Sequence, residues 1–194
     1  MFILASASPR RRELVRQLGF DFVVVVSDVP EEARPDEEPA SLVLRLAREK
    51  AAAVARLHPD AWVLGADTTV VLSGEALGKP VDRNEARDML NRLSGRSHHV
   101  MTGVALIGPT GQVEEETVDV SEVEFRVLRD AEIDAYVATG EPLDKAGAYG
   151  IQGGAAAFVA RVSGSYTNVV GLPLEVLRVW LDARHLIPNS GHNQ

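Results

Sequence analysis

Three consecutive arginines follow a Ser-Pro pair near the start of the chain. Ser8 is typical of a helix N-cap and Pro9 of a first helical residue, so Arg10, Arg11 and Arg12 fall in the first turn of a predicted helix. The positive end of the helix dipole disfavours each of these cations, on a scale of about 0.3–1 kcal/mol. A bound polyphosphate would neutralise both the arginine charges and the partial positive charge of the helix N-terminus. A solvated basic turn, paired with neighbouring acidic side chains, is the alternative interpretation.

A carboxylate interrupts an apolar, β-branched segment further along the chain. Asp67 lies between residues 61–65 and residues 68–72, which are both strand-like. An ionised carboxylate is costly in such a segment unless it is paired, solvated or bound to a metal. At the end of a strand facing a cleft, Asp67 would be a candidate metal ligand and a candidate base for activating water. An Asp turn between two short strands explains the same pattern.

Three lysines and one glutamine are further candidates for contacts with a nucleotide. Lys79 and Lys145 lie in predicted loops beside glycine or proline, where an ammonium group can reach phosphate oxygens, whereas Lys50 lies on a predicted helix. Gln152 follows in a glycine-rich stretch without Walker spacing, and its amide can both donate to and accept from a base edge. Taken singly, each of these residues is more simply explained as a solvated surface side chain.

Two pairs of adjacent titratable residues carry weaker signals. Glu31 and Glu32 belong to an acidic, Pro-rich segment at residues 30–39, which predicts an exposed loop with solvated charges. His98 and His99 are neighbours on a predicted strand, so their side chains point to opposite faces. That spacing argues against a two-histidine metal site.

The elements that would position these side chains alternate between strand and helix periods, which predicts an α/β fold. Strands are expected at residues 2–5, 20–26, 61–65, 68–72, 99–107, 118–127 and 155–162. Helices are expected at residues 9–18, 40–57, 84–93, 130–138 and 174–184. These elements form one predicted domain over residues 1–186, and a flexible tail is predicted over residues 187–194.

Composition limits the classes of protein to consider. The absence of cysteine excludes disulfides, thiolate catalysis and Cys-ligated zinc. A formal net charge of -8 argues against nonspecific binding to nucleic acid or to an anionic membrane. No apolar run approaches the roughly 20 residues that a membrane span needs. The N-terminal segment before the arginines is too short for a signal peptide, and basic residues follow it too soon. The cytoplasm is therefore the expected location.

Several motifs, in this order along the chain, closely resemble the Maf family of nucleoside triphosphate pyrophosphatases. They are LASASPRR at 4–11, LAREKA at 46–51, GADT at 65–68, GKP at 78–80, LSG at 93–95, EPLDKAGAYGIQG at 141–153 and VGLPL at 170–174. The resemblance implies a mixed sheet with flanking helices that form a two-lobed cleft, related to that of inosine triphosphate pyrophosphatases. It also implies hydrolysis of a nucleoside triphosphate to the monophosphate and pyrophosphate.

The same resemblance implies roles for individual residues. Asp67 would be the proton acceptor and would help to hold Mg²⁺ or Mn²⁺. Glu31 would be a second metal-binding carboxylate, although Glu32 can take its place in a variable loop. The phosphate-binding set would comprise Ser8, Arg10, Arg11, Lys50, Lys79 and Lys145. A homodimer is expected from the resemblance alone.

Three positions separate branches of the family. The branch acting on dTTP and UTP has Arg after Ser-Pro, Thr after the catalytic Asp and Gln in the glycine-rich motif, as this chain does with Arg10, Thr68 and Gln152. The branch similar to 7-methyl-GTP pyrophosphatases has Trp and Glu at the first and last positions. Three alternatives stay open: the same chemistry on a modified purine nucleotide, a nucleotide-binding division regulator without turnover, and an adaptor that grips an acidic partner.

Overall fold

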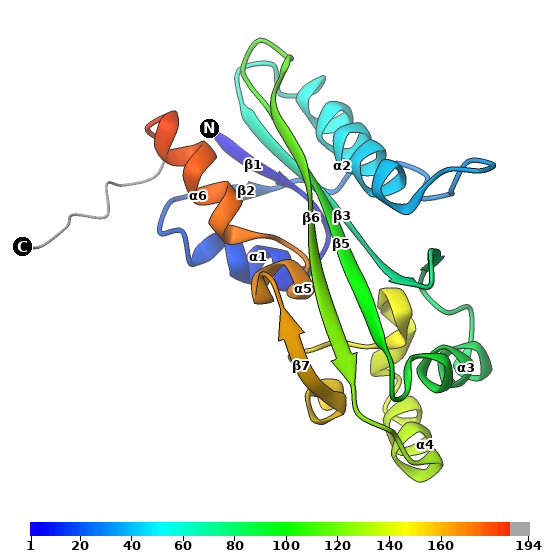
Figure 1. The fold of residues 1–194 in the computed structure, drawn as a ribbon. Coiled ribbons are helices and arrows are strands. Elements are labelled where there is room, and N and C mark those ends of the chain that lie inside the picture. The colour runs from blue at the N-terminus through cyan, green and yellow to red at the C-terminus, as the bar shows by residue number, and fades with distance from the viewer. Residues whose placement is uncertain (187–194) are drawn as a thin grey trace, which may run out of the picture.

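A mixed sheet of seven strands runs through the molecule in the computed structural model, which describes residues 1–186 (Figure 1). Six strands follow the order β2-β1-β3-β5-β6-β7, and β4 pairs with β3. β2, β1 and β3 are parallel, and all other neighbours are antiparallel. The strands are β1 (Phe2–Ala5), β2 (Val23–Val24), β3 (Trp62–Leu72), β4 (Glu75–Leu77), β5 (Ser97–Ile107), β6 (Val113–Phe125) and β7 (Val159–Ser163). The tail predicted at residues 187–194 lies outside the described residues.

Helices flank the sheet on both faces (Figure 1). The helix α2 lies alone on one face, whereas α1, α5 and α6 lie on the other, and α3 and α4 gather where β5 begins and β6 ends. The helices are α1 (Pro9–Arg16), α2 (Pro39–Ala55), α3 (Arg83–Leu93), α4 (Asp130–Ala138), α5 (Tyr166–Val170) and α6 (Leu174–Ala183). Three short 3₁₀ helices are Glu141–Asp144, Ala146–Ala148 and Gly154–Phe158. The mixed α/β fold expected from the sequence is confirmed.

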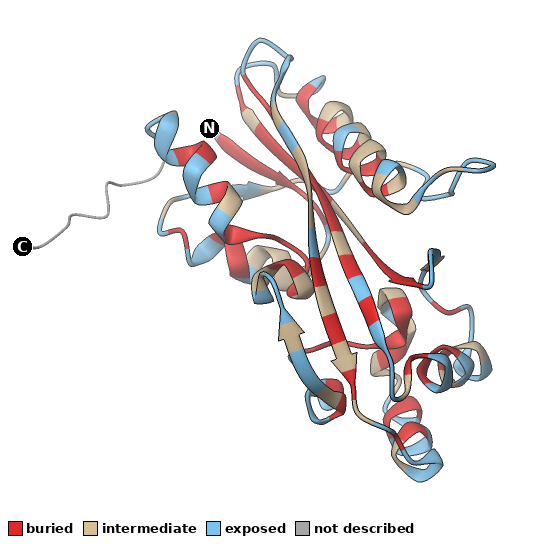
Figure 2. Ribbon diagram, in the orientation of Figure 1, coloured by how far each residue is buried: buried red, intermediate tan, exposed pale blue. Residues whose placement is uncertain are grey.

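The alternation of side chains along the strands divides the core between the two faces. Ile3 and Val63 pack beneath α2 in a small cluster that includes Val54 of that helix. Their neighbours Leu4 and Leu64 belong to a larger cluster on the opposite face, which continues to the far end of the sheet. The central strands are therefore buried on both faces over much of their length (Figure 2).

Two glycines let α2 approach the sheet closely. A Cβ atom at Gly65 of β3 would overlap the carbonyl oxygen of Ala47, and one at Gly103 of β5 would overlap that of Val43. The helix backbone therefore rests directly on two neighbouring strands, which only glycine allows here. This contact brings Lys50, on the buried side of α2, over the middle of β3.

The structure corrects several predicted boundaries. Residues 62–72 form one strand, not two, because β5 pairs with β3 without interruption from Val63 to Val71. Asp67 is consequently a mid-strand residue rather than part of a turn. The strand predicted at 20–26 is reduced to Val23–Val24, because β1 offers it only a short partner. The strand predicted at 155–162 begins as a 3₁₀ helix and becomes β7 only from Val159.

Within the part of the chain that the structure describes, every helix is too short or too polar to traverse a lipid bilayer.

Candidate active site

An opening in the edge of β3 creates a cleft. β1 pairs with β3 as far as Gly65, and β4 pairs with it only from Val70 onward. Among the described residues, no strand covers positions 66–69 on this side, while β5 covers them on the other. A cavity of about 570 Å³ lies at the opening, and Asp67 and Thr68 both line it.

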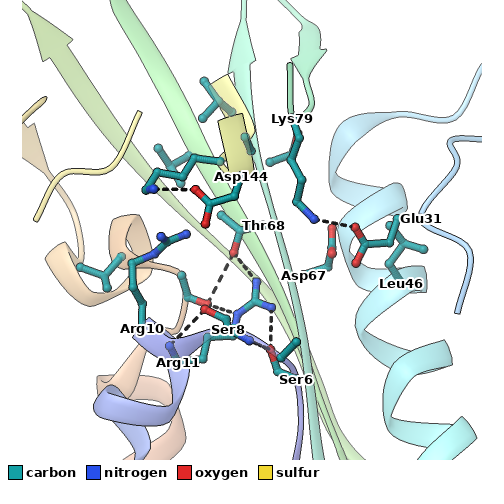
Figure 3. A pocket seen from close by; sticks show the side chains of 18 of the residues that line it. Ser6, Ser8, Arg10, Arg11, Glu31, Leu46, Asp67, Thr68, Lys79 and Asp144 are labelled. Atoms are coloured by element: carbon teal, nitrogen blue, oxygen red, sulfur yellow. Dashed lines mark hydrogen bonds and ion pairs between the residues drawn. The ribbon is translucent and has the colours of Figure 1, made fainter. Parts of the chain in front are cut away.

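The cleft collects nine of the ten residues that the sequence singles out for the site (Figure 3). They come from the start of α1, the loop before α2, α2 itself, β3 and the loops that carry Lys79 and Lys145. The nine residues are Ser8, Arg10, Arg11, Glu31, Lys50, Asp67, Thr68, Lys79 and Lys145. The tenth, Gln152, is exposed and is not among the lining residues, although its neighbour Ile151 is. Of the alternative acidic pair, Glu31 lines the cleft and Glu32 does not.

A buried ammonium group joins the two candidate metal ligands. Lys50 Nζ donates to Asp67 Oδ1 at 2.7 Å and to Glu31 Oε1 at 2.6 Å, and its side chain is only 8% exposed. The other Glu31 oxygen accepts from Lys79 Nζ at 3.0 Å. Burial alone would raise the pKa of Glu31, but hydrogen bonds and charge from Lys50 and Lys79 outweigh burial and lower this pKa to about 2. Both carboxylates thus face cations inside the cleft.

Arg11 is fixed inside the protein by four hydrogen bonds. Its Nε donates to the Gly171 carbonyl at 2.8 Å, and Nη1 donates to the Ala66 carbonyl at 2.9 Å and to Ser6 Oγ at 3.3 Å. Its Nη2 donates to Thr68 Oγ1 at 2.9 Å. Burial lowers the pKa of this guanidinium, and the nearby Asp67 carboxylate opposes the shift. With only five N–H donors in a guanidinium, Arg11 holds α1 to β3 and to the end of α5, and has little capacity left for phosphate.

Arg10 differs from its neighbour because it faces the opening of the cleft. It lines the cavity, and no hydrogen bond joins its side chain to another described residue. Across the cleft lies Asp144 (Figure 3). Burial tends to raise the pKa of Asp144, but Lys145 and then Arg10 lower it overall. Of the two arginines of the triplet that line the cleft, Arg10 is therefore the one available to an incoming anion.

Ser8 supports the beginning of α1, as its sequence position predicts. Its Oγ accepts from the backbone N–H of Arg11 at 3.3 Å, and its own N–H donates to Ser6 Oγ at 3.2 Å. Ser6 is buried and was not identified as a site residue from the sequence. The two serines shape the turn between β1 and α1, where the helix N-terminus meets the cleft.

The glycine-rich segment is held in place by Glu141, which sequence reasoning missed. Its carboxylate accepts from the Tyr136 hydroxyl and from the Gly154 N–H, each at 3.1 Å. Its backbone carbonyl accepts from Lys145 Nζ at 2.7 Å, and the same ammonium donates to Asp144 Oδ1 at 2.6 Å. A Cβ atom at Gly153 would overlap the Glu141 carboxylate, so a larger residue there would displace that side chain from its present contacts. Glu141 thereby orients the loop that carries Lys145.

A chain of hydrogen-bonded polar groups connects Thr68 in the cleft to Asn168 of α5. Thr68 Oγ1, which accepts from Arg11, lies 2.9 Å from Thr102 Oγ1. Thr102 donates to the Asn168 carbonyl at 3.2 Å, and the Asn168 amide donates to the Val100 carbonyl at 3.1 Å. Thr102 and Asn168 were missed from the sequence. A polar residue in the apolar run of β5 was the only local signal for Thr102.

Apolar side chains form one wall of the cleft. Val70, Val100 and Tyr149 line it, and the Tyr149 hydroxyl lies 2.8 Å from His98 Nε2. Burial lowers the pKa of His98 to about 4, so this imidazole is neutral near pH 7. His98 is buried and His99 exposed, which confirms that the two side chains point to opposite faces.

The donor set of the cleft fits a hard divalent cation. Asp67 and Glu31 each direct one carboxylate oxygen at the same ammonium group, so the cleft presents two hard oxygen donors at one point. No cluster of three or more metal-binding side chains occurs within the described residues. Mg²⁺ is commonly held by one or two carboxylates together with substrate phosphates and water, and these residues suit that arrangement.

The cleft combines several cationic side chains with two carboxylates that face one ammonium group, on an α/β scaffold, and this donor set suits a class of protein that binds a polyphosphate. The model of the family described as "Maf-like protein" matches residues 1–184. The chain belongs to this family. Six of the seven motifs that carry the resemblance contribute residues to the lining of the cleft, and the motif at 93–95 does not.

Individual relatives agree with this assignment. The chain is 60% identical over 174 residues to a protein of Symbiobacterium thermophilum named "dTTP/UTP pyrophosphatase", covering 89% of this chain and 88% of that protein. It is 56% identical over 172 residues to a Geobacter sulfurreducens protein of the same name, covering 89% and 90%. A solved HAM1 protein from Coxiella burnetii shares the fold, with a TM-score of 0.52, 20% identity and coverage of 94% and 98%.

Proposed function

We propose that this chain is a metal-dependent pyrophosphatase that hydrolyses dTTP and UTP to the monophosphate and pyrophosphate. The observation that carries the proposal is the Lys50 bridge between Asp67 and Glu31, at the base of a cleft lined by further cations. The names of the relatives at 60% and 56% identity support the substrates. Mg²⁺ or Mn²⁺ is the proposed cofactor.

The triphosphate would bind in the cleft. Arg10 at the N-terminus of α1, Lys79 and Lys145 all line the cleft and would contact the triphosphate. Both lysines are paired with carboxylates in the structure, Lys79 with Glu31 and Lys145 with Asp144. Phosphate oxygens would compete for these ammonium groups, because they are strong acceptors of charge-assisted hydrogen bonds.

The Asp67 carboxylate would orient the attacking water and accept its proton. The water oxygen forms a bond to the α-phosphorus while the bond from that phosphorus to the α/β-bridging oxygen breaks. The electron pair of the broken bond leaves on pyrophosphate, whose charge Arg10, Lys79 and Lys145 would stabilise. When bound by Asp67 and Glu31, the divalent cation would offset triphosphate charge and lower the pKa of the water.

Selectivity for a pyrimidine would come from the apolar wall and the branch-specific residues. Thr68 is engaged by Arg11 and Thr102, so its contribution would be to fix the edge of the base site rather than to bind with a free hydroxyl. Gln152 would need the glycine-rich segment to move before its amide reached a base, because the side chain is exposed outside the cleft lining.

Pyrophosphate release from a nucleotide panel tests the proposal. The panel comprises dTTP, UTP, CTP, 7-methyl-GTP, ITP and ATP, each with Mg²⁺, with Mn²⁺ and with chelator. Turnover on dTTP and UTP that disappears with chelator is the expected result. Turnover concentrated on 7-methyl-GTP or ITP would overturn the substrate, and nucleotide binding without turnover would overturn the activity.

We also propose a cytoplasmic homodimer. The lack of cysteine suits a reducing compartment, and the dimer rests on family resemblance. Size-exclusion chromatography with light scattering measures the assembly directly. A mass near the 20.9 kDa of one chain would contradict the dimer.

A further inference from the structure

The segment that carries Glu31 has no regular structure of its own. Between β2 and α2, the described residues 25–38 form neither helix nor strand, and residues 30–36 are all exposed. The contacts of Glu31 within the cleft are to Lys50 and Lys79, two groups that substrate phosphates would attract. A loop held only by these contacts would lose its position whenever a nucleotide bound. A separate anchor is therefore needed to keep Glu31 at the cleft.

Arg45 of α2 supplies that anchor on the other side of the loop. Its Nε and Nη2 donate to the two carboxylate oxygens of Glu37, at 2.6 and 2.7 Å. Nη2 also donates to the backbone carbonyl of Glu32 at 3.0 Å, directly beside Glu31. The side chains of Arg45 and Glu37 are only 14% and 10% exposed. This two-pronged geometry is specific to a guanidinium, because lysine cannot reproduce a planar fork.

Two further residues lock the anchor in place. Arg45 Nη1 donates to Glu49 Oε2 at 3.0 Å, one helical turn away on α2. Arg34 of the loop donates its backbone N–H to Glu37 Oε2 at 3.0 Å and its side chain to Glu49 Oε1 at 3.2 Å. Two arginines and two glutamates thus form a closed network that ties the loop to the helix. The same helix carries Lys50, so α2 fixes the position of Glu31 from both sides.

We propose that Arg45 is a positioning residue for metal binding, which fixes Glu31 in the cleft through the Glu32 carbonyl and Glu37. The inference rests on the proposed role of Glu31 as a metal ligand. It assigns no contact between Arg45 and the substrate or the metal. Arg45 acts by keeping the loop ordered, so its loss should weaken metal binding before any nucleotide is present.

The test compares Arg45→Met and Arg45→Lys with a matched control on the same helix, Arg48→Met. Arg48 also makes a two-pronged pair, to Glu116 at 2.6 and 2.7 Å, but this pair lies away from the loop. Mn²⁺ affinity without nucleotide is measured by electron paramagnetic resonance, and loop order by hydrogen exchange of residues 27–38. Arg45→Met should weaken Mn²⁺ binding by about 10-fold to 100-fold. Arg45→Lys should recover little of this loss, and Arg48→Met should bind as the parent chain does.

Faster exchange in residues 27–38, with the rest of the chain unchanged, is the second expected result for Arg45→Met. Parent-like Mn²⁺ affinity and parent-like exchange in a folded Arg45→Met sample would overturn the inference. If that variant fails to fold, Glu37→Gln removes the same anchor with little change of shape and is measured identically. A parent chain that binds no Mn²⁺ would instead refute the proposed metal, and loop exchange would still decide whether Arg45 fixes the segment.

Discussion

Lys50 holds two carboxylates together that would otherwise repel each other inside the cleft. Its side chain is almost fully buried, and such an ammonium is stable only when paired. The pairing directs Asp67 and Glu31 at one point. In the proposed mechanism Asp67 accepts a proton from water, and Lys50 balances the charge of its carboxylate before substrate arrives.

Replacing Asp67 with asparagine should remove the proton acceptor while preserving the side-chain shape. General-base catalysis contributes about 10²- to 10⁴-fold, so the turnover number on dTTP should fall within that range. The measurement is pyrophosphate release at saturating dTTP and Mg²⁺, together with thermal unfolding to show that the variant is folded. Asp60→Asn, at an exposed turn residue, is the control and should retain parent activity. Near-parent turnover of Asp67→Asn would refute the assigned role.

Substitution of the two neighbouring arginines should affect different properties, stability for Arg11 and substrate binding for Arg10. Arg11→Met leaves the Ala66 and Gly171 carbonyls without their donor and should lower the free energy of unfolding by about 2–4 kcal/mol. Arg10→Met removes a charge at the cleft opening and should raise KM for dTTP with little change in stability. Urea unfolding and steady-state kinetics on both variants check the contrast. Equal stability losses would show that both arginines are structural.

At the scale of elements, the close contact between α2 and the sheet sets the geometry of the site. Gly65 lies two residues before Asp67 on β3, and the helix backbone that it admits carries Lys50. The distance between α2 and β3 therefore determines the distance between Lys50 and Asp67. A shift of α2 outward would separate the pair without touching either residue.

Gly65→Ala tests this coupling. The new methyl group would overlap the Ala47 carbonyl oxygen and lie 2.8 Å from the Ala51 nitrogen. Overpacking of this kind costs about 1–3 kcal/mol, and turnover should fall as α2 moves away from Asp67. Adding Ala51→Gly should not rescue the variant, because the nearest obstacle is backbone. Urea unfolding and dTTP turnover measure both effects, and parent-like turnover would show that the ion pair tolerates movement of the helix.

The loop anchored by Arg45 should respond to acid at an unusually low pH. The hydrogen bond from Arg45, followed by that from the Arg34 backbone, lowers the pKa of Glu37 from 4.5 to about 2. The contact is therefore complete above pH 4.5 and is lost as the pH falls through about 2. The Arg34 amide, which donates to Glu37, reports this step by its NMR chemical shift. A midpoint near 4.5, or an unchanged transition in Glu37→Gln, would contradict the assignment.

Elements with long, regular patterns were predictable from the sequence, and short ones were not. The helix predicted at residues 84–93 spans Arg83–Leu93 in the structure, because its apolar spacing and the N-cap Asp82 define it locally. β4 and α5 were missed, since three and five residues are too few for a period to emerge. The division of β3 at Asp67 was wrong for another reason: a polar residue looked like a turn, whereas pairing with β5 keeps the strand continuous.

At the scale of the whole molecule, the site is made by segments that are distant in sequence. Motifs marked the residues of the cleft well, but motifs do not show which donors are already engaged. Arg11 illustrates the limit, because its partners Ala66 and Gly171 are 55 and 160 residues away. Arg45, Glu141 and Thr102 carry no chemistry of their own, so only the folded arrangement reveals how they position groups that do.

Because the cations that would face a triphosphate, Arg10, Lys79 and Lys145, come from segments distant in the sequence, a bound nucleotide should stabilise the whole molecule. A non-hydrolysable dTTP analogue with Mg²⁺, at 100 times its dissociation constant, should raise the free energy of unfolding by about 2.7 kcal/mol. Lys79→Met removes one of these cations and should require more analogue for the same increase in the free energy of unfolding. Arg48→Met should not. Thermal unfolding over a series of analogue concentrations provides the measurement. A stabilisation that is identical with Mg²⁺ and with chelator would show that nucleotide binding does not need the metal.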